Sequence, residues 1–146
     1  MTNGCAVRLD VRSSLDMIDL VQAVCDRVGR AAGLDDDAMH QVDYAVRESV
    51  VNAITHGNQH DDAKRVHIEF THVGDRSNPG IAVSVRDEGA GFDPGSVPDC
   101  CASENLLKAS GRGIFLMRNF VDRLVHRRVP GGGMEVVIVK HVQPLQ

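Results

Sequence analysis

Three short stretches decide the fold of this 146-residue chain: Glu48-Ser-Val-Val-Asn52-Ala, Asp87-Glu-Gly89-Ala-Gly91-Phe and Gly111-Arg-Gly113. In the first, a carboxylate and an amide lie one helical turn apart. In the second, an acidic residue at the expected end of a strand precedes two glycines, and in the third a pair of glycines opens a helix. No one of them is specific, but their order and spacing together indicate a site for a nucleotide, a metal ion and a reactive water or hydroxyl.

The composition is that of an ordinary globular protein, and we expect a single domain over residues 1–146, with 42% hydrophobic and 25% charged residues. A net charge of -4, only 3% aromatic residues and no Trp argue against direct binding of nucleic acid. The apolar runs are too short for a membrane span and the N-terminus lacks a signal-peptide pattern, so we expect a cytoplasmic protein. The four cysteines lack the spacing of a zinc site and are expected to be free thiols.

The N-terminal part predicts a strand followed by a helix. Residues 5–11 alternate as a strand does, and Ser13 or Ser14 would cap the helix, with Asp16 completing a capping box. Gly33 would end this helix. Its predicted apolar stripe consists of Leu15, Ile18, Val21, Cys25, Val28 and Ala32.

A second helix is predicted from about residue 36 to 57. Acidic residues at 35–37 favour its start, because they lie at the positive end of the helix dipole. At 100° per residue, Glu48 and Asn52 lie about 40° apart and away from the apolar stripe. The helix would therefore have one core face and one polar face. The predicted stripe consists of Met39, Val42, Val46, Val50 and Ala53.

Alternating residues predict four further strands, and a helix is expected before the last two. Strands are expected around 66–71 and 81–86, and a closing hairpin over 125–129 and 135–142, with a helix after residue 111. By strand parity Asp87 points to the apolar face, where an unpaired charge is costly and needs a partner. The irregular stretch 89–110 is of a length that is usually functional or mobile.

Each stretch has a structural and a chemical interpretation. In the structural interpretation, Glu48 and Asn52 form a solvated helix face. In the chemical interpretation, Glu48 accepts a proton and the amide oxygen of Asn52 binds Mg²⁺. Asp87 lies in a tight turn, or accepts a hydrogen bond from the exocyclic amine of adenine. The helix start at 111–113 follows a flexible loop, or binds phosphate through its free N–H groups. Lys108 and Arg112 are solvated, or meet phosphate oxygens.

Taken together, the stretches resemble the N box and two glycine boxes of the GHKL ATPase superfamily. The resemblance covers about residues 5 to 142 and is greatest to the anti-sigma regulatory factors of serine/threonine-protein kinase type. It implies the Bergerat fold, an α/β two-layer sandwich whose mixed, mostly antiparallel sheet is covered on one face by helices. The matching segments are Glu48-Ser-Val-Val-Asn52-Ala-Ile-Thr-His56-Gly57-Asn58, Asp87-Glu-Gly-Ala-Gly91-Phe-Asp-Pro94 and Glu104-Asn-Leu-Leu-Lys108-Ala-Ser-Gly-Arg-Gly113-Ile-Phe-Leu-Met-Arg118.

The resemblance implies a role for each matching residue. Glu48 matches the catalytic base and Asn52 the Mg²⁺ ligand. Asp87 matches the acid that reads adenine, and residues 93–110 match the ATP lid. The flanking glycines Gly89 and Gly91 match residues beside the base and sugar, and Gly111, Arg112 and Gly113 match the phosphate-binding helix start.

The resemblance also implies cofactors and partners. Members bind ATP with Mg²⁺, sequester a sigma factor or comparable regulator, and phosphorylate a serine on a small antagonist domain. We expect no direct contact with nucleic acid or membrane, and leave a homodimer open. Many relatives carry Thr where this chain has Met134. The alternative function is therefore a non-catalytic, protein-binding regulator with weak or absent nucleotide turnover.

Overall fold

The fold is an antiparallel sheet with helices on one face, seen in a computed structural model that describes residues 5–89 and 113–144. The sheet has five strands in the order β1-β2-β3-β5-β4, and all four of its ladders are antiparallel. The elements in chain order are β1 (Cys5–Arg12), the 3₁₀ turn η1 (Leu15–Met17), α1 (Ile18–Ala31), α2 (Asp36–Asn52), the π-helical turn η2 (Ala53–Gly57), β2 (Arg65–Val73), β3 (Gly80–Arg86), α4 (Gly113–Phe120), β4 (Arg123–Arg128) and β5 (Met134–His141).

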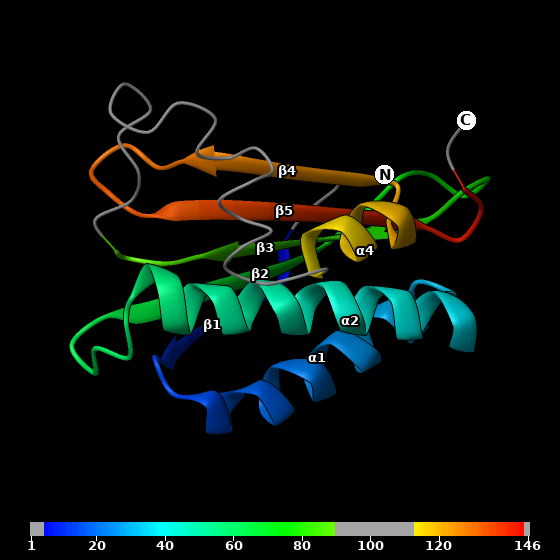
Figure 1. Ribbon diagram of the computed structural model, residues 1–146. Helices are drawn as coiled ribbons and strands as arrows, with labels where there is room; N and C mark the ends of the chain where they lie inside the picture. Colours follow the sequence, from blue (N-terminus) through cyan, green and yellow to red (C-terminus); the bar gives the residue numbers. More distant parts are fainter. Residues whose placement is uncertain (1–4, 90–112, 145–146) are drawn as a thin grey trace.

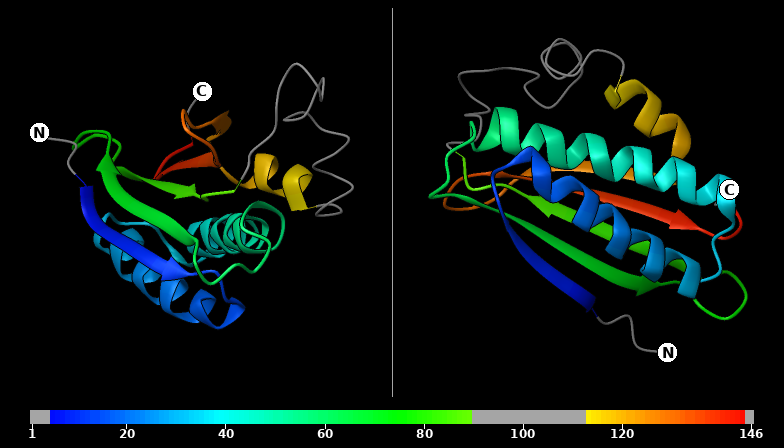
Figure 2. Two further views of the ribbon diagram at one scale, coloured as in Figure 1. Left: turned by 90° about the vertical axis from the view of Figure 1, so that its left-hand side faces the viewer. Right: turned by 90° about the horizontal axis from the view of Figure 1, so that it is seen from below.

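The helices form a second layer over one face of this sheet (Figure 1). Figure 2 shows α1 and α2 side by side across that face, with α4 next to α2. Side chains on alternate positions of β2 and β3 point into this layer because successive strand residues face opposite sides. The predicted two-layer α/β sandwich with helices on one face is confirmed. The sheet, predicted to be mixed and mostly antiparallel, is antiparallel in every described ladder.

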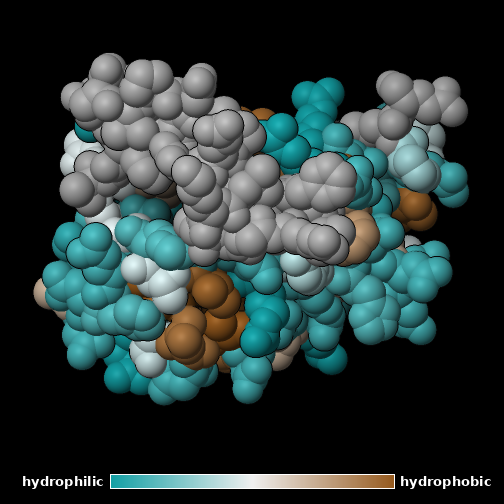
Figure 3. Space-filling model, viewed as in Figure 1, coloured by the Kyte–Doolittle hydropathy of each residue, from teal (hydrophilic) through white to brown (hydrophobic). Residues whose placement is uncertain are grey.

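The hydrophobic core lies between the two layers. The predicted stripe of α2 is buried along its whole length, from Met39 to Ala53, because an apolar face with helical period packs against the sheet. The largest fully buried side chains include Phe70, Met39, Ile54, Ile68, Ile81, Met117 and Ile138. Part of the helix layer remains apolar at the surface: Figure 3 shows a hydrophobic cluster between α1 and the C-terminal half of α2.

The start of the first helix differs from the prediction. The chain turns through η1, and Ser14 precedes it without a side-chain cap. Ser13 instead donates from Oγ to the Lys64 carbonyl, 2.6 Å away, so the predicted capping box is wrong. Because a 3₁₀ turn has three residues per turn, Leu15 leaves the apolar stripe and is 47% exposed.

The later helix boundaries follow local chemistry. The predicted end of α1 is confirmed, with Gly33 at φ +103°, a conformation that favours glycine. The Asp35 carboxylate caps α2 by accepting from the Ala38 N–H at 2.9 Å. The predicted helix over 36–57 is confirmed in extent, but its last five residues form the π-helical turn η2. No described helix has the length and apolar character needed to cross a membrane.

Candidate functional site

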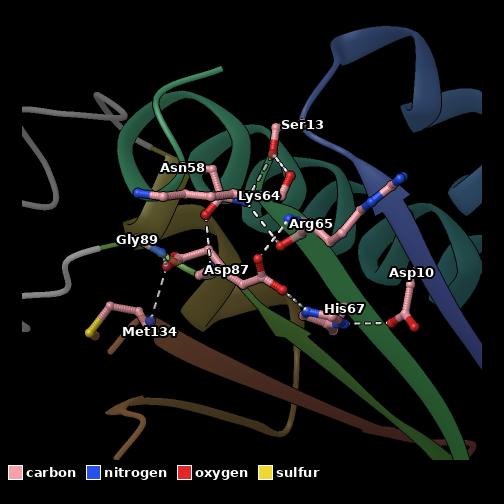
Figure 4. Close-up of polar contacts among 10 residues, drawn as sticks. Asp10, Ser13, Asn58, Lys64, Arg65, His67, Asp87, Gly89 and Met134 are labelled. Atoms are coloured by element: carbon pink, nitrogen blue, oxygen red, sulfur yellow. Dashed lines mark hydrogen bonds and ion pairs between the residues drawn. The ribbon is translucent and has the colours of Figure 1, made fainter. Parts of the chain in front are cut away.

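The site centres on Asp87, which follows β3 and is 5% exposed. Its Oδ1 accepts hydrogen bonds from the Gly89 N–H at 2.9 Å and from the Met134 N–H at 3.2 Å (Figure 4). The Asp87 N–H in turn donates to the Met134 carbonyl at 3.0 Å. The inward orientation predicted from strand parity is therefore confirmed, and the required partners are backbone N–H groups.

The environment of Asp87 changes its proton affinity. Burial raises the pKa of this carboxyl, while the two backbone N–H groups, and more weakly Lys64 and Arg86, act in the opposite direction. Burial is the larger effect. A buried carboxylate with donors on one oxygen suits recognition of a ligand N–H by the other oxygen.

Three glycines surround Asp87, and each is there because a side chain would not fit. A Cβ on Gly57 would overlap the Asp87 carboxylate and lie 2.8 Å from Asp87 Cβ. A Cβ on Gly133 would overlap the Asp87 carbonyl, and one on Gly89 would overlap the Gly57 carbonyl. Gly133 also has φ +92°. The structure thus brings the end of η2, the end of β3 and the start of β5 into contact at one carboxylate.

Sequence reasoning found Gly89 but missed Gly57 and Gly133. The first closes the predicted second helix, and the second lies in the Pro-Gly-Gly-Gly run that reads as a hairpin turn. The sequence analysis considered only the side chain of Met134, whereas this residue contacts Asp87 through its backbone N–H. The signal available in the sequence was Gly57 itself, which follows His56 in the segment that resembles the N box.

Glu48 and Asn52 lie on α2, on the helix that leads to Gly57. Both are partly exposed, as predicted for its polar face. Asn52 directly precedes η2, and Glu48 lies one α-helical turn, about 6 Å of rise, before Asn52. The residues thus form a series along one helix. Tyr44 lies one turn before Glu48, and burial together with the Glu48 charge raises the pKa of its phenol.

The helix α4 packs beside this part of α2. The Ser49 hydroxyl donates to Met117 Sδ at 3.6 Å, and the ring of Tyr44 meets that of Phe120 edge to face with centroids 5.5 Å apart. The described part of α4, from Gly113 onward, thus packs on the same helix that carries Glu48 and Asn52. Four predicted residues, Gly91, Lys108, Gly111 and Arg112, and the predicted lid over 93–110 lie outside the described residues.

A second charged cluster lies next to Asp87 on β1 and β2. His67 Nδ1 is 2.5 Å from Asp10 Oδ1, and its Nε2 is 2.5 Å from Glu88 Oε2 (Figure 4). Contact with His67 lowers the pKa of Glu88. Over residues 5–89 and 113–144 no group of three or more His, Cys, Asp or Glu side chains could hold a metal ion.

Comparison with known proteins agrees with this geometry. The family model of the histidine kinase-like ATPase domain matches residues 11–140. The chain is 32% identical over 110 residues to the anti-sigma F factor of Geobacillus thermodenitrificans (strain NG80-2), covering 73% of this chain and 71% of that protein. It is 31% identical over 108 residues to the anti-sigma F factor of Clostridium beijerinckii, covering 71% of each. It is 23% identical over 147 residues to the serine-protein kinase RsbW of Staphylococcus aureus, covering 96% of this chain and 89% of that protein.

Proposed function

The chain belongs to the family of histidine kinase-like ATPase domains, and on this basis we propose that it is an ATP-binding serine/threonine-protein kinase of the anti-sigma type. The observation that carries the proposal is the buried Asp87 carboxylate, held by backbone N–H groups and surrounded by three glycines. It lies at the end of the helix that carries Glu48 and Asn52. This arrangement supports Asp87 as the acid that reads adenine, Asn52 as the metal ligand and Glu48 as the base.

In this proposal Asp87 accepts a hydrogen bond from the exocyclic amine of adenine. Its Oδ1 is already used by two backbone donors, so Oδ2 is the oxygen left for the base. Gly89 and Gly91 let the backbone approach the base and sugar without a Cβ in the way. The helix start at Gly111, Arg112 and Gly113, with Lys108, would receive the phosphates.

Asn52 is the proposed Mg²⁺ ligand, and its chemistry fits. Its side-chain oxygen is the hard ligand that Mg²⁺ prefers, and Mg²⁺ needs few protein ligands because it keeps several waters and binds substrate phosphates. The ion would neutralise charge on those phosphates. Glu48, one turn away and partly exposed, would accept the proton of a serine hydroxyl as its oxygen attacks the γ-phosphorus and ADP leaves.

The proposed partners are proteins. They are a sigma factor or comparable regulator, which the chain would sequester, and a small antagonist domain whose serine it would phosphorylate. The names of the relatives support this assignment: two are anti-sigma F factors and one is a serine-protein kinase.

A phosphotransfer assay tests the proposal. The protein is incubated with γ-labelled ATP, Mg²⁺ and the small proteins that copurify with it, and compared with Glu48→Gln. Glu69→Gln is the matched control, because Glu69 lies on β2 and pairs with Arg8 at 2.9 Å. We expect label on a serine, an approximately hundredfold or greater loss in Glu48→Gln, and no loss in Glu69→Gln.

Two results would contradict the kinase assignment. One is an absence of label transfer by the wild type, and the other is equal transfer by Glu48→Gln. Calorimetry with ATP and Mg²⁺ then separates the alternatives, because binding without transfer would identify a non-catalytic regulator that uses nucleotide only to change its protein contacts.

A further inference from the structure

Asn58, the residue directly after η2, is buried at 1% exposure and uses every polar atom of its side chain. Its Nδ2 donates to Ser13 Oγ at 2.9 Å and to the Arg65 carbonyl at 3.0 Å. Its Oδ1 accepts from the Glu88 N–H at 2.8 Å. We propose that Asn58 is a positioning residue that holds the Asp87–Glu88 peptide and thereby sets the preference of this protein for adenine. The proposal rests on the proposed function of Asp87.

The contacts of Asn58 join three segments that are distant in the sequence. Ser13 follows β1, and its Oγ donates in turn to the Lys64 carbonyl at 2.6 Å. Arg65 begins β2 (Figure 4), and Glu88 follows β3. One amide therefore connects the ends of three adjacent strands to the end of the helix that carries the proposed base and metal ligand.

The backbone after Asn58 supports a positioning role. Gln59 and His60 have φ values of 53° and 58°, a conformation that is uncommon for residues other than glycine. The Asn58 N–H closes the π-helical turn on the Ala53 carbonyl at 2.8 Å, and the His60 N–H reaches the Ile54 carbonyl at 2.9 Å. Such strain persists only where the surroundings hold it, and it gathers at functional sites. The three hydrogen bonds of the buried Asn58 side chain fix the residue that directly precedes this backbone.

The peptide that Asn58 holds is also fixed from its other side. The Glu88 carboxylate accepts from the Arg65 N–H at 3.1 Å and contacts His67 at 2.5 Å. With Glu88 fixed at both its N–H and its side chain, the preceding Asp87 has little freedom. Its carboxylate then keeps Oδ1 on Gly89 and Met134, and Oδ2 towards Gly57.

This arrangement predicts where an Asn58 variant loses affinity. The hydrogen bond from Asp87 to the adenine amine depends on its geometry, because a hydrogen bond weakens steeply when it is misaligned. Contacts to the sugar and phosphates do not pass through the Asp87–Glu88 peptide. Loosening the peptide should therefore weaken binding of an adenine nucleotide and leave binding of a nucleotide without that amine almost unchanged.

Inosine triphosphate is a suitable probe, because it carries an oxygen where adenine carries the amine. Calorimetry measures the Kd of ATP and of inosine triphosphate, with Mg²⁺, for the wild type, Asn58→Ser and the milder Ser13→Ala. Val21→Ala is the control, because Val21 is 1% exposed in α1 and its truncation destabilises the core without contacting this network. Urea unfolding of each variant measures the stability.

We expect the wild type to prefer ATP over inosine triphosphate by about tenfold or more, the value of one hydrogen bond to a charged group. Asn58→Ser should lose most of this preference, and Ser13→Ala part of it, through weaker ATP binding. Val21→Ala should keep the wild-type ratio of the two Kd values, even if it loses as much stability as Asn58→Ser. An Asp87→Asn background should abolish the effect of Asn58→Ser on the ratio.

Two different failures can be told apart. If the wild type binds neither nucleotide, or binds both equally, the proposed function of Asp87 fails. If the wild type prefers ATP and both Asn58→Ser and Ser13→Ala keep its ratio, Asn58 is only structural and the present inference is overturned. Should Asn58→Ser not fold, the ratio measured for Ser13→Ala decides by the same criterion.

Discussion

Replacing Gly57 by Ala tests directly whether the carboxylate of Asp87 needs the space that this glycine leaves. A Cβ at position 57 would overlap the carboxylate and lie 2.8 Å from Asp87 Cβ. The Asp87 side chain must therefore move, and its hydrogen bonds from Gly89 at 2.9 Å and Met134 at 3.2 Å are lost or weakened.

The expected magnitude follows from these contacts. A hydrogen bond to a charged group contributes about 1.5 to 3 kcal/mol, and the longer of the two lies at the low end, so their loss costs about 3 kcal/mol. Alanine is favoured over glycine in a helix by about 1 kcal/mol, which offsets part of this cost. We expect Gly57→Ala to lower the free energy of unfolding by about 2 kcal/mol. Displacement of Asp87 should also weaken ATP binding by about tenfold or more, since 1.4 kcal/mol corresponds to a factor of ten.

Urea unfolding and calorimetry with ATP measure the two effects. Gly131→Ala is the control, because among the described residues no atom beyond its chain neighbours lies within 4 Å of a Cβ at that position, while its φ is +91°. That variant should show backbone strain of about 1 to 2 kcal/mol and normal ATP binding. A Gly57→Ala protein that is as stable as the wild type and binds ATP normally would refute the reasoning, because Asp87 would then have relaxed at no cost.

Three further predictions concern charge and packing elsewhere. Burial, and to a lesser extent Asp26, raise the pKa of Asp43 to about 7. The stability that protonated Asp43 contributes is therefore lost as pH rises from about 4 through 7. Asp43→Asn should therefore flatten this decline and be more stable than the wild type at pH 8, as measured by urea unfolding. Burial, and to a lesser extent the charge of Arg118, lower the pKa of His126 to about 4. The stability that neutral His126 contributes is therefore lost as pH falls from about 6.5 towards 4, by on the order of 3 kcal/mol. His126→Leu should remove that acid loss in the same titration, and an unchanged profile would contradict the assignment. Phe120→Ala removes the edge-to-face contact with Tyr44 and should destabilise the protein by about 2 to 4 kcal/mol. The same loss in a Tyr44→Ala background would show that the two rings do not interact.

Much of the fold follows from local sequence pattern. The apolar period of α2 predicted its buried face, because a helix repeats every 3.6 residues whatever it packs against. Alternation along β3 predicted that Asp87 points inward, because strand residues alternate between two faces. Both predictions depend only on residues within one element, and both are confirmed.

Local patterns were less reliable at the joints between elements. Ser13 has the spacing of a helix cap, but its hydroxyl bonds to Lys64, a residue 51 positions further along the chain. The bond replaces the cap because Ser13 is buried, and a buried hydroxyl without a partner costs more than an uncapped exposed turn. The helix accordingly starts through a 3₁₀ turn, which moves Leu15 to the surface.

The sequence by itself therefore determined the elements, their buried faces and the candidate residues Glu48, Asn52 and Asp87. Only the tertiary structure decided what surrounds Asp87. Gly57, Gly133 and Asn58 are far from it in the chain and meet it only because β5 pairs with β3 and α2 ends beside them. Periodicity describes the face of one element, whereas contact between two elements depends on how all of them pack. The three stretches thus supplied the candidate groups, and packing decided what surrounds Asp87.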